Sequence, residues 1–188
     1  MFEDFEKKDS VVVVYTGDGK GKTSASLGLM VRALGTGWKV AYVQFVKHWE
    51  VGEHKAIAKM QEVFGDDLVL HKGGKGFYNA GEMSAKDVSE DEHRKAAEDT
   101  FKFALDSVES GDFDLVICDE INNSVNDGLL DADVLIKLIE KRNDKTSLCL
   151  TGRNFPQELI ELTDIATDMA KIKHHFDDKF LANEGIDF

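Results

Sequence analysis

Short apolar runs alternate with amphipathic stretches along most of the chain, a pattern typical of α/β proteins with a mostly parallel sheet. Apolar residues spaced three and four positions apart predict the helices. The glycine-rich, polar segment 73–84 has no periodic spacing of apolar residues and is predicted to be a long loop. A length of 188 residues is most simply one domain, over residues 1–188. The predicted strands are 11–15, 40–46, 68–71, 115–118, 146–150 and 169–174, and the predicted helices are 22–34, 53–64, 89–110, 131–142 and 156–162.

Three of the predicted helices carry residues that favour a helix start. Ser89 is followed three residues later by Glu92, so the two side chains can form a capping box. Asp131 stands at the N-cap position of the next helix. Pro156 stands where the first turn of the last helix tolerates proline. These residues set the expected starts of the three helices.

The segment TGDGKGKTS, residues 16–24, joins the first predicted strand to the first predicted helix. It resembles the phosphate-binding pattern G-x-x-x-x-G-K-[ST], but Thr16 holds the place of the first glycine and Gly17 comes one position late. Backbone N–H groups of such a turn form an anion site at the start of the following helix. Lys22 would neutralise phosphate charge, and the Thr23 hydroxyl would hold Mg²⁺. An ordinary glycine-rich turn is the alternative.

Two further polar motifs end predicted strands, at the same edge of the predicted sheet as the glycine loop. DLVICDE delivers Asp119 and Glu120 to this edge, where they either support a hydrated Mg²⁺ or cap the next segment. TGR delivers Arg153, which either grips phosphate oxygens or is a surface arginine after a turn. Together with the loop, these residues predict a protein that binds Mg²⁺ and a nucleoside triphosphate. They leave the reaction open, because phosphate-loop folds host many activities.

Composition narrows the class of partner. The 188 residues carry a formal net charge of −13 with a pI near 4.8, which argues against binding to nucleic acid or to an anionic membrane surface. A phosphate site must therefore be built from local groups. No apolar stretch approaches the roughly 18 residues of a membrane span, and the first residues are too charged for a signal peptide.

The few cysteines and histidines carry no metal-binding spacing. Cys118 and Cys149 lie in apolar runs, so we expect buried free thiols and a cytoplasmic protein. The scattered histidines are expected to face solvent, and these are His48, His54, His71 and His93.

Six motifs, in order from residue 13 to the C-terminus, resemble the P-loop type of ATP:corrinoid adenosyltransferase. TGDGKGKTSAS is similar to that family's own short loop, so the three-residue spacer is a family trait. RALGTGWKVAYVQFVK, GGKGF and LVICDEI each resemble the family's motif at that place. LTGRNFPQELIELTDIATDM and the ending KHHFDDKFLANEGIDF complete the set. The resemblance implies a P-loop, RecA-like, three-layer α/β/α fold.

The resemblance also implies a reaction. The 5′-deoxyadenosyl group of ATP is transferred to the cobalt(I) of a corrinoid such as cobalamin, and triphosphate is released. Cobalt(I) is itself the nucleophile, so the reaction requires no general base. ATP is expected to bind in the reverse sense relative to ordinary P-loop proteins, so that the loop grips a phosphate chain that departs whole. Lys20, Lys22, Arg153 and Mg²⁺ (or Mn²⁺) would stabilise the developing negative charge.

Site residues follow from the same resemblance. The expected catalytic residues are Lys20, Lys22, Thr23 and Glu120, with Thr23 and Glu120 holding the metal ion and Asp119 supporting them. The expected ATP-binding residues are Gly17, Asp18, Gly19, Lys20, Gly21, Lys22, Thr23, Ser24, Gln44 and Arg153.

Phe77, Tyr78 and Asn79 are expected on the corrin side of the site. Phe77 matches the aromatic residue that covers the lower face of the corrin, where it would displace the axial ligand and make cobalt(II) easier to reduce. Asn79 stands where well-known members have tryptophan. Either Tyr78 substitutes for that aromatic residue, or corrin activation is weaker, or the substrate differs.

Two other functions compete with the transferase. A paralogue could bind ATP or cobalamin without making the carbon–cobalt bond, and a conventional P-loop ATPase or kinase would release phosphate or ADP. The expected partners are ATP, a reduced corrinoid, an unidentified reductase and a second copy of the chain, with neither nucleic acid nor membrane.

Overall fold

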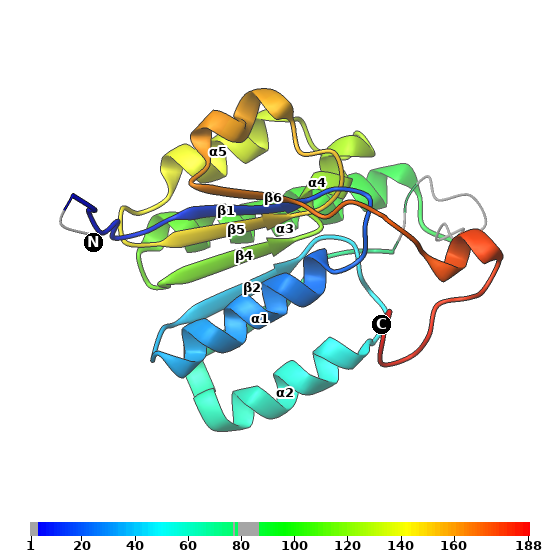
Figure 1. Cartoon of the computed structure of the whole chain (residues 1–188), viewed down its shortest axis with the longest axis horizontal. Coiled ribbons are helices and arrows are strands. Elements are labelled where there is room, and N and C mark those ends of the chain that lie inside the picture. Colours follow the sequence, from blue (N-terminus) through cyan, green and yellow to red (C-terminus); the bar gives the residue numbers. More distant parts are fainter. Residues whose placement is uncertain (1–3, 77, 79–86) are drawn as a thin grey trace.

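A parallel β-sheet forms the centre of the protein in the computed structural model, which describes residues 4–76, 78 and 87–188 (Figure 1). Within those residues the sheet has six strands in the spatial order β3-β2-β4-β5-β1-β6. Every neighbouring pair is parallel. The strands are β1 (Val12–Thr16), β2 (Val40–Gln44), β3 (Leu68–Lys72), β4 (Leu115–Asp119), β5 (Ser147–Thr151) and β6 (Ile165–Asp168).

Helices cover both faces of this sheet (Figure 1). Helices α1 and α2 pack on one face, and α3, α4 and α5 pack on the other. The arrangement confirms the predicted three-layer α/β/α fold. The helices are α1 (Lys22–Gly35), α2 (Gly52–Phe64), α3 (Glu90–Ser110), α4 (Ile121–Asn126) and α5 (Asp133–Lys141), and short 3-10 helices span Gly65–Asp67, Gln157–Leu162 and His175–Asp178.

Alternation along the strands divides the core between the two faces. In β4, Val116 and Cys118 pack on the side of α3 and α5, whereas Leu115 and Ile117 pack on the side of α1. All of β4 is buried, as expected for a parallel strand covered on both faces. Cys118 and Cys149 are buried free thiols, as predicted.

The start of α3 is formed as predicted. Ser89 Oγ accepts the N–H of Glu92 at 3.3 Å, and Glu92 Oε2 accepts the N–H of Ser89 at 2.9 Å. The predicted capping box is therefore confirmed.

The other two predicted helix starts are wrong. α5 begins at Asp133 without a side-chain cap, and Asp131 contributes its backbone carbonyl to the N–H of Val134 instead. After Pro156 the chain forms a 3-10 helix rather than an α-helix, and the proline precedes its first turn. In both places the suggested residue closes the turn through its backbone carbonyl, which accepts the N–H of Val134 or of Leu159.

The last strand lies at Ile165–Asp168 and not at 169–174 as predicted. It is an edge strand, and all four of its residues are exposed, so it carries no apolar alternation that a sequence could reveal. Its position depends instead on pairing with β1 and on Asp164, whose Oδ2 accepts the N–H of Val12 at 2.7 Å.

The carboxyl ends of all strands lie at one edge because the strands are parallel. The glycine loop leaves β1 at this edge, and Gln44, Asp119 and Thr151 end β2, β4 and β5 there. The fold therefore brings together polar side chains that are far apart in the sequence.

Candidate active site

The glycine loop between β1 and α1 packs against the residues that follow β6. Gly19 donates its N–H to the carbonyl oxygen of Met169 at 2.6 Å. A Cβ on Gly19 would lie 2.4 Å from that oxygen, so a larger residue does not fit without a shift of the backbone. Gly21, directly before α1, has a φ of 118°, which also favours glycine. Two independent constraints thus fix the loop.

The Lys22 ammonium group is folded over this loop. Its Nζ donates hydrogen bonds to the carbonyl oxygens of Gly17 and Gly19, both at 2.6 Å. Burial, and after it the positive charge of Arg153, lowers the pKa of Lys22. Lys22 and Arg153 therefore concentrate positive charge at the loop of a strongly acidic protein.

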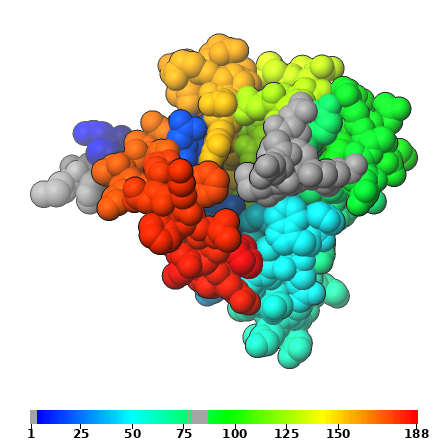
Figure 2. Space-filling view, turned by 90° about the vertical axis from the view of Figure 1, so that its right-hand side faces the viewer, coloured from blue at the N-terminus to red at the C-terminus, as the bar shows by residue number. Residues whose placement is uncertain are grey.

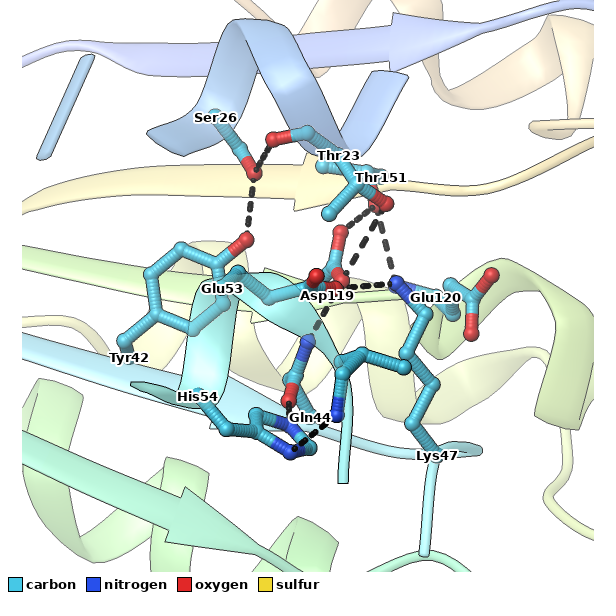
Figure 3. Close-up of polar contacts among 11 residues, drawn as sticks. Thr23, Ser26, Tyr42, Gln44, Lys47, Glu53, His54, Asp119, Glu120 and Thr151 are labelled. Carbon is cyan, nitrogen blue, oxygen red and sulfur yellow. Dashed lines mark hydrogen bonds and ion pairs between the residues drawn. The ribbon is translucent and has the colours of Figure 1, made fainter. Parts of the chain in front are cut away.

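Asp119 is fully buried and lies at the centre of a hydrogen-bond network (Figure 3). Thr151 Oγ1 donates to its Oδ1 at 2.8 Å. Thr23 Oγ1 and Gln44 Nε2 both donate to its Oδ2, at 3.3 and 3.2 Å. The three donors come from β5, from the first turn of α1 and from β2. The structure thus joins three predicted site residues, Thr23, Gln44 and Asp119, with Thr151, which the sequence analysis did not single out.

Glu120 adopts a backbone conformation that is rare outside glycine, with a φ of 63°. Its N–H donates to Thr151 Oγ1 at 2.9 Å, while its buried Oε2 has no hydrogen-bond partner among the described residues. Burial, and after it the negative charge of Asp119, raises the pKa of Glu120 to about 7. Glu120 directly follows Asp119, which accepts the Thr23 hydroxyl, and an unpartnered carboxylate oxygen and a hydroxyl are oxygen donors of the kind that Mg²⁺ requires.

A buried ion pair that the sequence analysis missed lies beside these acids. Lys47 Nζ contacts Glu53 Oε1 at 2.7 Å, and both side chains are largely buried. Burial alone would lower the pKa of Lys47, but the charges of Asp119 and Glu120 together with the ion pair to Glu53 raise it overall. The available signal was the pair of opposite charges, Lys47 and Glu53, six residues apart across the start of α2.

His54 overturns the expectation that the scattered histidines face solvent. Its exposed fraction is 4%, and its Nε2 is hydrogen-bonded to Gln44 Oε1. His93 is equally buried at 4%, and His71 is partly buried, whereas His48 is exposed as predicted. A buried histidine depends on partners elsewhere in the sequence, so isolated spacing could not reveal it.

A hollow of about 590 Å³ opens on the β6 side of the glycine loop. Gly17 and Asp18 line it on the loop side, Asn154 and Phe155 line it after β5, and Lys171 lines it from the C-terminal segment. A hollow of this size can admit part of a nucleotide next to the loop.

Comparison with known proteins identifies the family. A family model described as ATP:corrinoid adenosyltransferase BtuR/CobO/CobP matches residues 8–188. The chain belongs to this family. The corrinoid adenosyltransferase of Pseudomonas aeruginosa is 32% identical over 178 residues, which are 95% of this chain and 83% of that protein. The corrinoid adenosyltransferase of a Sinorhizobium species is 34% identical over 180 residues, 95% of this chain and 80% of that protein. The corrinoid adenosyltransferase of Escherichia coli K12 is 29% identical over 179 residues.

The adenosyltransferase also shares its fold with a solved structure, the flagellar accessory protein FlaH from Methanocaldococcus jannaschii. The TM-score is 0.52 at 12% sequence identity, over 86% of this chain and 71% of FlaH. At that identity the likeness concerns the fold alone. Among the described residues of the adenosyltransferase, no helix has the length and apolar character needed to cross a membrane.

Lys20 of the adenosyltransferase pairs with the C-terminal tail, residues 169–188. Its Nζ lies 3.2 Å from Asp187 Oδ1. The tail continues to the start of α2, where Phe188 approaches Gly52, and Figure 2 shows the red tail beside the cyan segment that contains this helix. The tail thus contacts the loop twice, through Met169 directly after β6 and through Asp187 near the C-terminus.

Two other predicted ATP-binding residues are exposed. Ser24 lies in the first turn of α1, and Arg153 follows β5, where its backbone N–H donates to Asn123 Oδ1 at 3.1 Å. The side chain of Arg153 is therefore accessible to a ligand while its backbone is held in place.

On the predicted corrin side of the adenosyltransferase, the structure describes Tyr78. Its ring lies 5.3 Å from the ring of His93 and packs against the core on the α3 side of the sheet. Phe77 and Asn79 lie outside the described residues.

Proposed function

We propose that the protein transfers the 5′-deoxyadenosyl group of ATP to the cobalt(I) of a corrinoid and releases triphosphate. The electron pair of cobalt(I) forms the bond to C5′, and the C5′–O bond breaks with its electron pair leaving on triphosphate. The observation that carries the proposal is the buried cluster of Thr23, Asp119 and Glu120 beside a glycine loop, in a chain that matches the family over residues 8–188. No side chain in this cluster needs to act as a general base.

The chain's own cations would stabilise the departing triphosphate. Lys22 now donates to two loop carbonyls, and its ammonium group could exchange these bonds for phosphate oxygens without leaving the loop. Lys20 and Arg153 are exposed at the same edge and would add positive charge. Such fixed charges act most strongly where negative charge develops during the reaction. We also propose that the loop residues 17–24 bind the phosphates, with Gln44 close to the nucleotide.

Thr23 and Glu120 would hold a Mg²⁺ or Mn²⁺ ion, with Asp119 orienting the Thr23 hydroxyl. The unpaired Oε2 of Glu120 supports this assignment. When bound, the ion would neutralise charge on the phosphate chain. Asp119 already accepts a hydrogen bond from Thr23, so the hydroxyl oxygen keeps its lone pairs available for the cation.

Phe77, Tyr78 and Asn79 would lie against the corrin. The half-buried ring of Tyr78 lies beside His93 near the start of α3, which supports a role for Tyr78 there. Asn79 replaces the tryptophan of well-known members, and it is the one residue that favours the second candidate function, an ATP- or cobalamin-binding module that does not make the carbon–cobalt bond.

We further propose that residues 1–188 act as one domain, that the protein is cytoplasmic and that it works as a homodimer with a separate reductase supplying cobalt(I). Two buried free thiols suit a reducing compartment. The C-terminal tail exposes large apolar side chains that suit contact with a second copy, and these are Ile172, Phe176, Phe180, Leu181 and Ile186.

An anoxic assay with Mg-ATP and chemically reduced cob(I)alamin tests the proposed reaction. The optical change to adenosylcobalamin and the release of triphosphate are measured in parallel. One triphosphate per carbon–cobalt bond is the expected result. ATP binding without alkylation would instead support the binding module, and release of ADP would mean that the loop performs ordinary phosphoryl transfer.

A further inference from the structure

We propose that His54 is a positioning residue for the metal site, because it fixes the orientation of the Gln44 side-chain amide against Asp119. The inference rests on the proposed metal site and adds to it a residue that touches no substrate. It starts from a chain of hydrogen bonds that runs from the start of α2 to the end of β4 (Figure 3).

His54 is held at both ring nitrogens. The backbone N–H of Val51 donates to its Nδ1 at 3.4 Å, so Nδ1 carries no proton. Nε2 therefore carries the proton of the neutral ring and donates it to Gln44 Oε1. Burial, followed by the positive charge of Lys72, lowers the pKa of His54 and favours this neutral form.

The histidine decides which end of the Gln44 amide faces Asp119. Gln44 is 1% exposed, so neither end can turn to water. With Oε1 facing His54, the amide Nε2 donates to Asp119 Oδ2 at 3.2 Å. The reversed amide would set Oε1 against the carboxylate and its N–H against the N–H of His54. Both contacts would be repulsive, and a buried polar group without a partner is costly.

The amide orientation matters because Thr23 shares the same carboxylate oxygen. Asp119 Oδ2 accepts hydrogen bonds from both Gln44 and Thr23. A carboxylate fixed by Gln44 keeps the Thr23 hydroxyl proton directed towards Asp119, which leaves the hydroxyl oxygen free for a cation. Groups that orient metal ligands in this way commonly change metal affinity by about 10–100-fold.

Calorimetric titration with ATP, once with Mg²⁺ and once with EDTA, tests the proposal without an activity readout. His54→Leu removes the donor at similar size and is expected to reduce the gain in ATP affinity from Mg²⁺ about tenfold. Affinity for metal-free ATP should stay the same. His54→Gln places an amide N–H where Nε2 lies and should restore the gain. His71→Leu, at a partly buried histidine whose ring stacks on Phe103 and forms no hydrogen bond of this network, is the matched control.

Each outcome of the titration decides one point. An unchanged gain in His54→Leu would overturn the role of His54 while leaving the metal site intact. If both variants fold and His54→Gln loses as much of the Mg²⁺-dependent gain in ATP affinity as His54→Leu does, the N–H donor of His54 does not control metal binding, and the proposal is overturned. If Mg²⁺ gives the wild type no gain at all, the metal site itself fails and this proposal fails with it.

The tautomer of His54 can also be measured in the unaltered protein, so the test does not depend on folded variants. Long-range ¹H–¹⁵N correlation spectra should show a neutral ring protonated at Nε2. A ring protonated at Nδ1 would force the Gln44 amide to turn and would overturn the proposal.

Discussion

Glu120 combines two unfavourable features, one in its backbone and one in its side chain. Its left-handed backbone and its buried carboxylate without a partner among the described residues are both unfavourable. Such features persist at functional sites because the surrounding structure holds them in place. Binding of a cation to this carboxylate would offset the cost. The same unpartnered oxygen therefore explains both the unfavourable energy and the proposed metal site.

The raised pKa of Glu120 makes stability depend on pH. Below pH 4.5 the carboxyl is protonated in the folded and the unfolded chain, so it adds no cost. As the pH rises towards about 7, the unfolded chain ionises first and the folded state loses stability, in total about 3 kcal/mol. Glu120→Gln should therefore become more stable than the wild type, with an advantage that grows by about 2 kcal/mol from pH 5.5 to pH 8.

Urea unfolding in EDTA at the two pH values measures this difference. Asp131→Asn, an exposed acid outside the network, provides the control. The pKa assignment is refuted if the advantage of Glu120→Gln is the same at both pH values.

Among single residues, the sequence predicted site residues only where they belong to a motif, and it missed buried groups that are held by other side chains. Lys22, Thr23, Asp119 and Glu120 were predicted because each follows or precedes a strand in a recognisable pattern. His54 was placed in solvent, because its partner Gln44 is ten residues away and its burial depends on how α2 packs. Hydrogen bonds between distant side chains leave no local pattern.

The starts of α3 and α5 allow a direct test of how much an N-cap side chain contributes to stability. Ser89→Ala removes a side-chain cap and should cost about 1 kcal/mol in the free energy of unfolding. Asp131→Ala removes a residue that the sequence suggested as a cap but that makes no such bond, so its cost should stay within about 0.5 kcal/mol. Chemical denaturation of both variants gives the comparison, and equal costs would contradict the described start of α5.

The glycine loop offers a second matched pair. Gly19→Ala would force a Cβ against the Met169 carbonyl, so we expect a loss of about 1–3 kcal/mol in stability and a loss of ATP binding. Gly28→Ala, in the exposed part of α1 with open space around it, should raise stability by about 0.5–1 kcal/mol. Thermal unfolding and ATP titration check both, and normal ATP binding by Gly19→Ala would argue against the close approach.

The elements differ in how far the sequence could predict them. Fully buried strands such as β4 can be recognised by continuous apolar residues, and the limits of β4 and β5 were predicted to within a residue, whereas β2 ends two residues earlier than predicted. The short edge strand Ile165–Asp168 has no buried face, so its sequence does not differ in apolar character from the residues after it, which were mistaken for the strand. The 3-10 helix Gln157–Leu162 was predicted as an α-helix, because apolar spacing does not distinguish the two over six residues.

At the scale of the whole molecule, the net charge of −13 opposes the approach of ATP. Salt screens this long-range repulsion, whereas the short contacts of the loop are screened less. The association rate of Mg-ATP should therefore rise with ionic strength, the reverse of the usual behaviour of anion-binding sites. Stopped-flow measurements with a fluorescent ATP analogue at fixed free Mg²⁺ test this. An association rate that falls as ionic strength rises would mean that the cations near the loop, rather than the net charge, determine the electrostatic field that ATP meets.

The contact between the glycine loop and the residues after β6 has a consequence for biosynthesis. The loop is made almost first, yet its neighbours β5 and β6 are made almost last. Closing such long-range contacts is slow, because the intervening chain must be ordered first. A nascent chain that stops before Ile165 should consequently fail to retain ATP, which filter binding on stalled ribosomes can check. ATP binding by a nascent chain would then show that all the strands of the sheet have been synthesised.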